Sequence, residues 1–169
     1  MRAPNIDPEF YTIQVTSVAG EKGEVLVELY DVDGRGLARP INLSVRSAVS
    51  AGQPVMVPGF VTRGQGMTTL FIRAVGPGLA DFGVENNLPD PVLQFYRDDE
   101  VIGSNIGWST GDDPTGVELA GETAGAFALS PNGLDSALLM SVLPGPYTAH
   151  VSSESGRNGA VLVEVYEIY

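Results

Sequence analysis

The sequence predicts an all-β protein, an antiparallel β-sandwich of jelly-roll-like form with short helical turns in its loops. Apolar and polar residues alternate over many short segments that start about 8 to 15 residues apart and end in turn residues. The chain of 169 residues contains 21 Gly and 12 Pro, which without a collagen period are typical of tight turns between strands. No segment with helical spacing is long enough for the crossover helix of a βαβ unit. The length fits one ordinary hydrophobic core.

An internal repeat suggests how the chain is divided. Residues 147–169, YTAHVSSESGRNGAVLVEVYEIY, repeat residues 11–33, YTIQVTSVAGEKGEVLVELYDVD, with 11 of 23 positions identical at an offset of 136 residues. We call these segments the C-terminal copy and the N-terminal copy. In each copy two alternating segments flank a glycine-containing turn, which predicts a strand hairpin. An offset of domain length indicates a tandem array. Residues 11–35 then form the C-terminal β-hairpin of a preceding repeat, and residues 36–169 form one complete module.

The first ten residues, MRAPNIDPEF, have no counterpart in the C-terminal copy. Asp7-Pro8-Glu9-Phe10 is also what two joined cloning sites can encode. We therefore interpret residues 1–10 as a vector leader or a linker.

The remaining elements follow from alternation and turn residues. Residues 55–62 and 68–75 are expected to pair as strands across the turn at 63–67, and residues 92–96 and 101–104 form a hairpin around Arg97-Asp98-Asp99-Glu100. Further strands are predicted at 41–46, 136–142, 147–152 and the C-terminus. A helical turn is predicted at 79–84 and a short helix around 116–121.

Charge and composition exclude several classes of protein. The chain has 21 Asp and Glu against 9 Lys and Arg, a formal charge of −12. Such a surface repels phosphate backbones and anionic lipid, so we expect neither a nucleic-acid partner nor membrane insertion. The sequence has no cysteine, which excludes disulfides, thiolate metal sites and a cysteine nucleophile.

Several motifs resemble a known family. DPVLQFY at 90–96, VIGSN at 101–105, GPYT at 145–148 and VLVEVY at 161–166 resemble the bacterial pre-peptidase C-terminal type of β-sandwich. The segments at 42–46, 59–61 and 73–84 look like a tandem repeat of large secreted bacterial surface proteins. The resemblance covers roughly residues 41–169 and implies an accessory, non-catalytic module. It carries over no catalytic residue.

Carboxylates in predicted turns are candidate calcium ligands. Calcium prefers several oxygen ligands from carboxylates and carbonyls, and loops between sandwich strands can supply them. The candidates are Asp98, Asp99, Asp112 and Asp113. Turn chemistry explains the same residues without metal, because Asp favours turns. Calcium is the only cofactor that the sequence suggests.

Trp108 and Ser109 raise two further alternatives. Trp108 lies in a predicted loop, where an aromatic ring can stack on a sugar or pack against the core. Gly107-Trp108-Ser109-Thr110-Gly111 fits the G-x-S-x-G pattern of serine hydrolases, but the pattern requires a strand before it and a helix directly after it. The only histidine for a general base is His150, and its equivalent in the N-terminal copy is Gln14.

Together these features favour a non-catalytic structural or adhesive repeat module of a secreted or cell-surface bacterial protein. Its expected partners are neighbouring repeats of the same protein. A homo-oligomer formed through donated strands 11–33 is a second expectation, because an exposed strand edge invites pairing. The alternative is a carbohydrate-binding module centred on Trp108 with calcium-stabilised loops, and a serine hydrolase using Ser109 is third.

Overall fold

The computed structural model describes residues 9–21, 23, 25–31, 40–50 and 57–169. The chain divides into two compact units, Met1–Pro40 and Ile41–Tyr169. The second unit holds all the strands and helices assigned within the described residues. The expected boundary at residue 35 lies outside the described residues, and so do the first eight residues of the expected leader.

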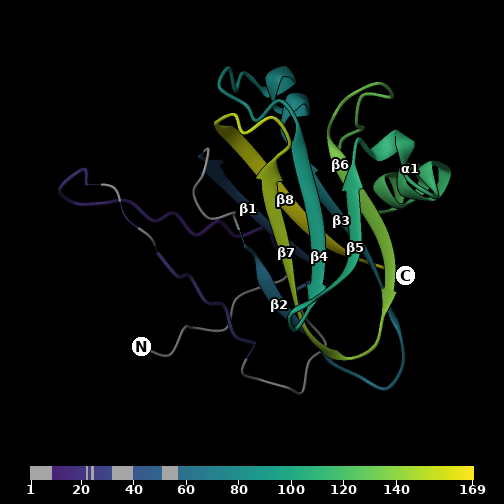
Figure 1. The fold of residues 1–169 in the computed structure, drawn as a ribbon. Helices are drawn as coiled ribbons and strands as arrows, with labels where there is room; N and C mark the ends of the chain where they lie inside the picture. Colours follow the sequence, from purple (N-terminus) through teal and green to yellow (C-terminus); the bar gives the residue numbers. More distant parts are fainter. Residues whose placement is uncertain (1–8, 22, 24, 32–39, 51–56) are drawn as a thin grey trace. The chain divides into compact units, whose positions relative to one another are not determined.

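The second unit is a β-sandwich with two short helical turns and one α-helix (Figure 1). Its described residues form two four-stranded sheets, one with the order β1-β8-β3-β6 and the other with the order β2-β7-β4-β5. The strands are β1 (Asn42–Val49), β2 (Gly59–Thr62), β3 (Thr68–Val75), β4 (Pro91–Arg97), β5 (Glu100–Ile106), β6 (Ser136–Val142), β7 (Gly145–Ser153) and β8 (Gly159–Ile168). The 3-10 turns are η1 (Pro77–Phe82) and η2 (Trp108–Thr110), and the helix is α1 (Pro114–Thr123).

The strand pairing is that of a jelly roll. β4 pairs with β5, β3 with β6, β2 with β7 and β1 with β8, all antiparallel. The chain therefore runs as one long antiparallel ribbon folded at the β4–β5 turn. The rolling of this ribbon adds the β3–β8 and β4–β7 pairs and closes both sheets. The predicted fold class is confirmed.

Two predicted hairpins are wrong, and the roll explains both. β2 and β3 were expected to pair with each other, but they lie in different sheets. β7 and β8 likewise lie in different sheets, so the C-terminal copy forms an arch between the sheets and not a hairpin. In a rolled ribbon only the two middle strands pair with their sequence neighbours, which is why the hairpin predicted around Asp98 and Asp99 is confirmed.

The core lies between the inner faces of the two sheets. Alternation places Val161, Val163 and Val165 of β8 inward, with exposed fractions of 0%, 1% and 6%. The opposite sheet contributes Leu93 and Phe95, both fully buried. Further members of this core are Val49, Leu70, Ile72, Ala74, Leu88, Val142, Tyr147, Ala149 and Val151.

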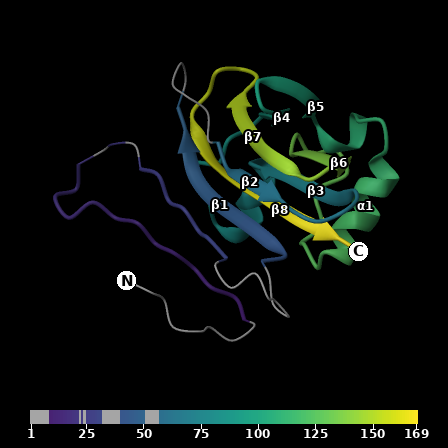
Figure 2. The ribbon, with the colours of Figure 1, turned by 90° about the horizontal axis from the view of Figure 1, so that it is seen from below.

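Part of the outer face of the β1-β8-β3-β6 sheet, over β3, β6 and the end of β8, is also covered, by α1 and the segment that follows it (Figure 2). A second apolar cluster forms there around Phe71, Trp108 and Val117. α1 begins where Asp113 accepts a hydrogen bond from the backbone N–H of Gly116 at 2.9 Å, with Pro114 in the first turn. It contains the short helix predicted around residues 116–121.

The N-terminal copy forms no strand among its described residues, although strands were predicted at 11–17 and 25–32. Extended chain becomes a strand only when a neighbour satisfies its backbone groups. The C-terminal copy shows that the two halves of this motif pair with other strands and not with each other. Residues 22, 24, 32 and 33 of the N-terminal copy lie outside the described residues.

Candidate functional site

A buried ion pair lies beneath α1 and the segment after it. Arg73 points outward from β3 and is 1% exposed. Its Nε donates to Glu164 Oε2 of β8 at 2.5 Å, and its Nη1 donates to the carbonyl oxygen of Phe127 at 2.7 Å. The guanidinium carbon lies 4.1 Å from the centre of the Phe127 ring, within the range of a cation–π contact. Arg73 therefore holds the segment after α1 against the sheet.

Tyr166, two residues after Glu164 in β8, is the third member of this network. Its hydroxyl donates to Glu164 Oε1 at 2.8 Å. Burial and the negative charge of Glu164 raise the pKa of Tyr166 to about 12. Both carboxylate oxygens of Glu164 thus accept hydrogen bonds from side chains of the sheet.

A small cleft opens beside the ion pair, between α1, the outer sheet face and residues 126–129. Its volume is about 90 Å³, and Phe71, Arg73, Trp108 and Gly121 contribute to its lining. Ligand pockets for drug-sized molecules commonly occupy about 300–1,000 Å³. The cleft is therefore smaller than a typical ligand pocket.

Trp108 is a core residue. It is 7% exposed and packs with Phe71 and Val117. Its indole Nε1 donates to the carbonyl oxygen of Ser130 at 2.8 Å. Since the ring is covered by protein on the outer sheet face, it does not present an open platform of the kind that stacks on a sugar.

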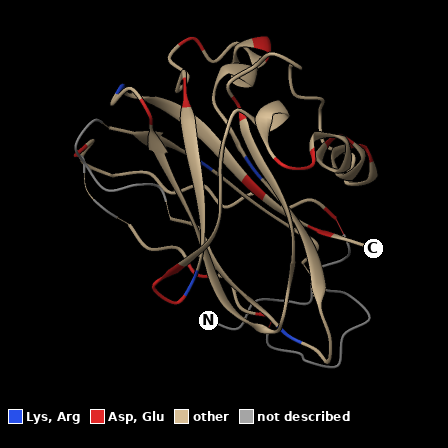
Figure 3. Cartoon of the chain, turned by 45° about the vertical axis from the view of Figure 1, so that its right-hand side comes forward, with Lys and Arg blue, Asp and Glu red and all other residues tan. Residues whose placement is uncertain are grey.

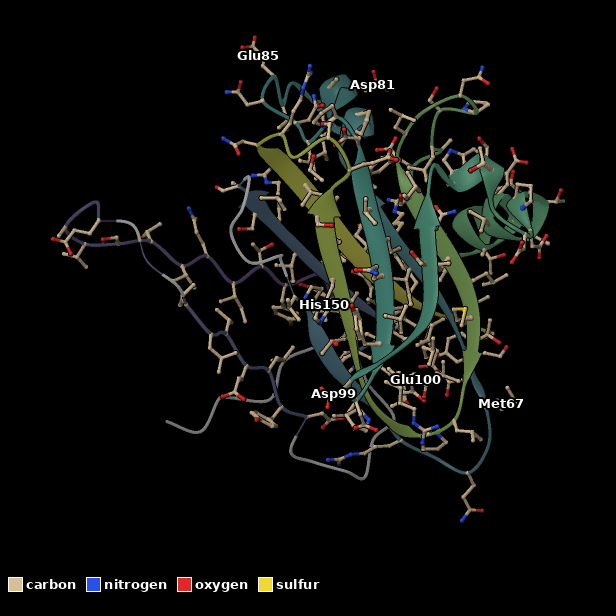
Figure 4. The ribbon with its side chains drawn as sticks, viewed as in Figure 1. Met67, Asp81, Glu85, Asp99, Glu100 and His150 are labelled. Carbon is tan, nitrogen blue, oxygen red and sulfur yellow. The ribbon has the colours of Figure 1, made fainter. Side chains whose placement is uncertain are left out.

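The four predicted calcium ligands are not brought together. Asp98 and Asp99 lie in the β4–β5 turn, at one end of β5, whereas Asp112 and Asp113 follow its other end (Figures 1 and 4). The seven residues of β5 keep the two pairs roughly 20 Å apart. Asp98 has a φ of 53°, a left-handed turn conformation that Asp tolerates. In the part of the chain that the structure describes, no three Asp, Glu or His side chains could hold a metal ion.

Ser109 and His150 do not form a dyad. Ser109 lies in η2 after β5, while His150 points outward from β7 (Figure 4). The His150 ring packs against Tyr96 with the ring centres 4.2 Å apart, and its Nε2 lies 3.2 Å from the Thr148 hydroxyl oxygen. Burial lowers the pKa of His150. These contacts belong to the outer face of the sheet, and Ser109 is not part of them.

Two buried carboxylates that the sequence analysis did not single out hold loops in place. The first is Asp135, which is fully buried. It accepts backbone N–H bonds from Gly76 at 2.8 Å and from Gly78 at 3.1 Å, and so fixes the turn before η1. Burial raises the pKa of Asp135 even though these bonds favour its charged form. The Gly76-Pro77-Gly78 turn, which leaves backbone N–H groups without strand partners, is the sequence signal for such a clamp.

Asp90 holds the arch between β7 and β8. Its Oδ1 accepts from the Ser153 hydroxyl at 2.6 Å and its Oδ2 from the Ser155 N–H at 3.1 Å. Burial acts to raise the pKa of Asp90, but these hydrogen bonds and the charge of Arg157 outweigh it and leave the pKa below its usual value. Asp90 lies in a motif that carried the family resemblance, but nothing in its local pattern indicates a contact more than 60 residues away.

Charge is spread over the molecule. Figure 3 shows Asp and Glu mostly in loops and on α1, with a few on the strands. They do not gather on one face of a sheet. In the described residues no helix is long and apolar enough to cross a membrane.

No protein-family model and no curated protein matches the chain. Among solved structures, the chain is similar to the pre-peptidase C-terminal domain of a collagenase from Bacillus anthracis. The likeness has 12% sequence identity and a TM-score of 0.43, and covers 76% of this chain and 98% of that domain. The motifs at 90–96, 101–105, 145–148 and 161–166 resemble the same domain type.

Proposed function

We propose that residues 41–169 are a non-catalytic structural or adhesive module of a secreted or cell-surface bacterial protein, set in tandem with modules of the same fold. The observation that carries this proposal is the repeat at an offset of 136 residues. It places the last two strand segments of one module ahead of a complete module. A spacer needs a self-contained core and a well-hydrated surface. Residues 41–169 have such a core, and their 14 Asp and Glu against 5 Lys and Arg give them a formal charge of −9.

The hydrogen bonds of the buried charged side chains support the same structural role. Arg73, Asp90 and Asp135 are each almost fully buried, and each holds a loop or a neighbouring strand. Side chains used in this way maintain the shape of the scaffold. The cleft beside Arg73 has a volume of only about 90 Å³, which is below the usual range for a drug-sized ligand.

The pairing of the module ends determines how modules would follow one another. Asn42 at the start of β1 lies opposite Tyr166 near the end of β8, so the chain enters and leaves the module at the same end. Successive modules joined through residues 34–40 would therefore lie side by side, with their linkers at the same end. Each added module would lengthen the array by roughly 20–30 Å, about the width of four strands with their side chains.

Small-angle scattering tests this arrangement. Residues 34–169 are appended once and twice after Tyr169, and the maximum dimension is compared with that of the original chain. We expect a regular increase per module and one common melting temperature. A compact particle whose maximum dimension does not grow would refute the spacer role.

Binding and turnover are measured on the same three proteins. Saturable binding to insoluble polysaccharide, growing with the number of modules, would replace the spacer role with carbohydrate binding. Turnover of ester or peptide substrates that is lost in Ser109→Ala would replace it with catalysis. We expect neither.

A further inference from the structure

The N-terminal copy has the local geometry of the arch between β7 and β8. Gly20 has a φ of 72°, and its equivalent 136 residues later has a φ of 71°. The Ser17 hydroxyl accepts a hydrogen bond from the Glu21 N–H at 3.0 Å, and the equivalent bond in the C-terminal copy is 2.9 Å. The Tyr30 hydroxyl donates to Glu28 Oε1 at 2.8 Å, as its equivalent does at 2.8 Å. At these described positions the N-terminal copy thus shares the backbone conformation and hydrogen bonds of the arch, although its described residues form no strand.

The same apolar positions have opposite environments in the two copies. Val25, Val27 and Leu29 are 67%, 49% and 67% exposed. Their equivalents in β8 are 0%, 1% and 6% exposed, because they face the core. Burying these three side chains would remove their apolar surface from water, which is favourable. The N-terminal copy would therefore be stabilised by binding in a position like that of β8, where these side chains face a hydrophobic core.

The arch occupies two strand positions, one in each sheet. β8 lies between β1 and β3 in one sheet, and β7 lies between β2 and β4 in the other. Removing the arch leaves six strands, β1 to β6, with an open position in the middle of each sheet. We call these strands the six-strand framework.

We propose that the N-terminal copy is a strand pair that fills this gap in the six-strand framework of a module of the same fold. Its first half takes the position of β7 and its second half the position of β8. The partner is the six-strand framework of a neighbouring module of the array. This inference goes beyond the spacer role, and its failure would leave that role intact.

The chain can also make this insertion on itself. Tyr30 in the place of Tyr166 would lie opposite Asn42. The 11 residues 31–41 would then connect two adjacent antiparallel strands, whose Cα atoms lie about 5 Å apart. A loop of this length closes easily. The result is a circular permutation of the module, closed by the N-terminal copy in place of the C-terminal one.

Two differences favour the C-terminal copy in this particular framework. Ala149 is fully buried, and its equivalent in the N-terminal copy is Ile13. The larger side chain would overfill the core at that point. Arg157, whose charge lowers the pKa of Asp90, is replaced by Glu21. The N-terminal copy consequently fits a framework with more room opposite Ile13, as expected if it evolved within another module.

A second copy of the chain can also supply the six-strand framework, and the experiment below recognises that outcome by its mass.

The test disables the C-terminal copy and asks whether the N-terminal copy replaces it. Val163→Asp places a charge at a buried position of β8, and Val27→Asp is the matched change in the N-terminal copy. Both are made in the full chain, alone and together, and Val163→Asp is also made in residues 41–169. Trp108, the single tryptophan, reports the folding of the module through its fluorescence. Light scattering gives the mass.

We expect Val163→Asp to abolish cooperative unfolding in residues 41–169 but not in the full chain. The double variant should lose the transition, and Val27→Asp alone should behave as wild type. Ile13→Ala should raise the melting temperature of the full-chain Val163→Asp variant, because it restores the small residue opposite the core. A monomer indicates insertion in the same chain and a dimer indicates insertion in a second copy, and both support the proposal.

A second pair of proteins removes β7 and β8 altogether. Residues 1–142 should fold with Trp108 buried, whereas residues 41–142 should not. The proposal is overturned if residues 1–142 are as unfolded as residues 41–142, or if Val163→Asp unfolds the full chain and residues 41–169 equally.

Discussion

Gly159 at the start of β8 tolerates no side chain. A Cβ atom there would lie 2.4 Å from the backbone nitrogen of Leu88 and 2.5 Å from the carbonyl carbon of Asn87. Both are backbone atoms, so relief requires the 86–88 segment to move by about 1 Å to reach ordinary contact distance. Gly159→Ala is therefore a local test of how closely this segment is held against the sheet.

The cost follows from the contacts that the movement disturbs. The Leu88 N–H donates to the Ala160 carbonyl oxygen at 2.8 Å, and the Ala160 N–H donates to Asn86 at 2.7 Å. Weakening two such bonds costs about 1 kcal/mol each. Crowding the core around Leu88, which is fully buried, adds about 1–3 kcal/mol. We expect Gly159→Ala to lower the free energy of unfolding by about 3 kcal/mol, a fall in melting temperature of roughly 10 °C.

The repeat supplies a matched control. Gly23 is the equivalent glycine of the N-terminal copy, and a Cβ atom there would meet nothing within 4 Å. Gly23→Ala should change the free energy of unfolding by less than about 0.5 kcal/mol. Urea denaturation followed by Trp108 fluorescence measures both variants. Equal stabilities for Gly159→Ala and Gly23→Ala would refute the reasoning.

Three further predictions concern the buried charges. Glu164→Gln should lower the free energy of unfolding in urea by about 3 kcal/mol, because it leaves the buried Arg73 without its anion. The matched Glu28→Gln should have little effect, and equal effects of the two substitutions would contradict the ion-pair assignment. The pKa of Asp90 is lowered in the folded protein, so its contribution to stability is present above about pH 4 and is lost as the pH falls through the folded pKa. The stability difference between wild type and Asp90→Asn should therefore shrink from pH 5 to pH 2.5. The pKa of Asp135 is raised in the folded protein, so the pH dependence is the opposite: its contribution to stability is present below about pH 4 and is lost as the pH rises through the folded pKa. Wild type should therefore lose stability relative to Asp135→Asn between pH 3.5 and pH 7. A stability difference that does not change with pH would show that the carboxyl is not desolvated.

Local pattern determined much of this protein. The alternation of Val161, Val163 and Val165 predicted a strand with one core face, and the structure buries all three. The turn at Asp98 and Asp99 predicted the one hairpin of adjacent strands that the described residues contain. The capping Asp113 and Pro114 accompany the short helix predicted nearby. Each of these features depends on residues within a few positions of one another.

Partner choice was decided by the tertiary structure. The turns at 63–67 and 155–159 have the composition of hairpin turns, yet each connects strands of opposite sheets. The pairing of β1 with β8 joins residues more than 100 positions apart, as in Val45 opposite Val163. A strand's apolar face indicates that it needs neighbours but not which neighbours, since many registers bury the same side chains.

The same distinction applies to the candidate site. Trp108, Asp112 and Asp113 were singled out as residue types, and only the folded chain shows Trp108 buried and the Asp pairs at opposite ends of β5. Arg73 and Glu164 lie 91 positions apart and meet on adjacent strands. The sequence determined the alternation, the turns and the repeat, because these depend on near neighbours. The tertiary structure decided that the repeated segment is an arch spanning both sheets, because long-range pairing determines which edges of a strand are satisfied.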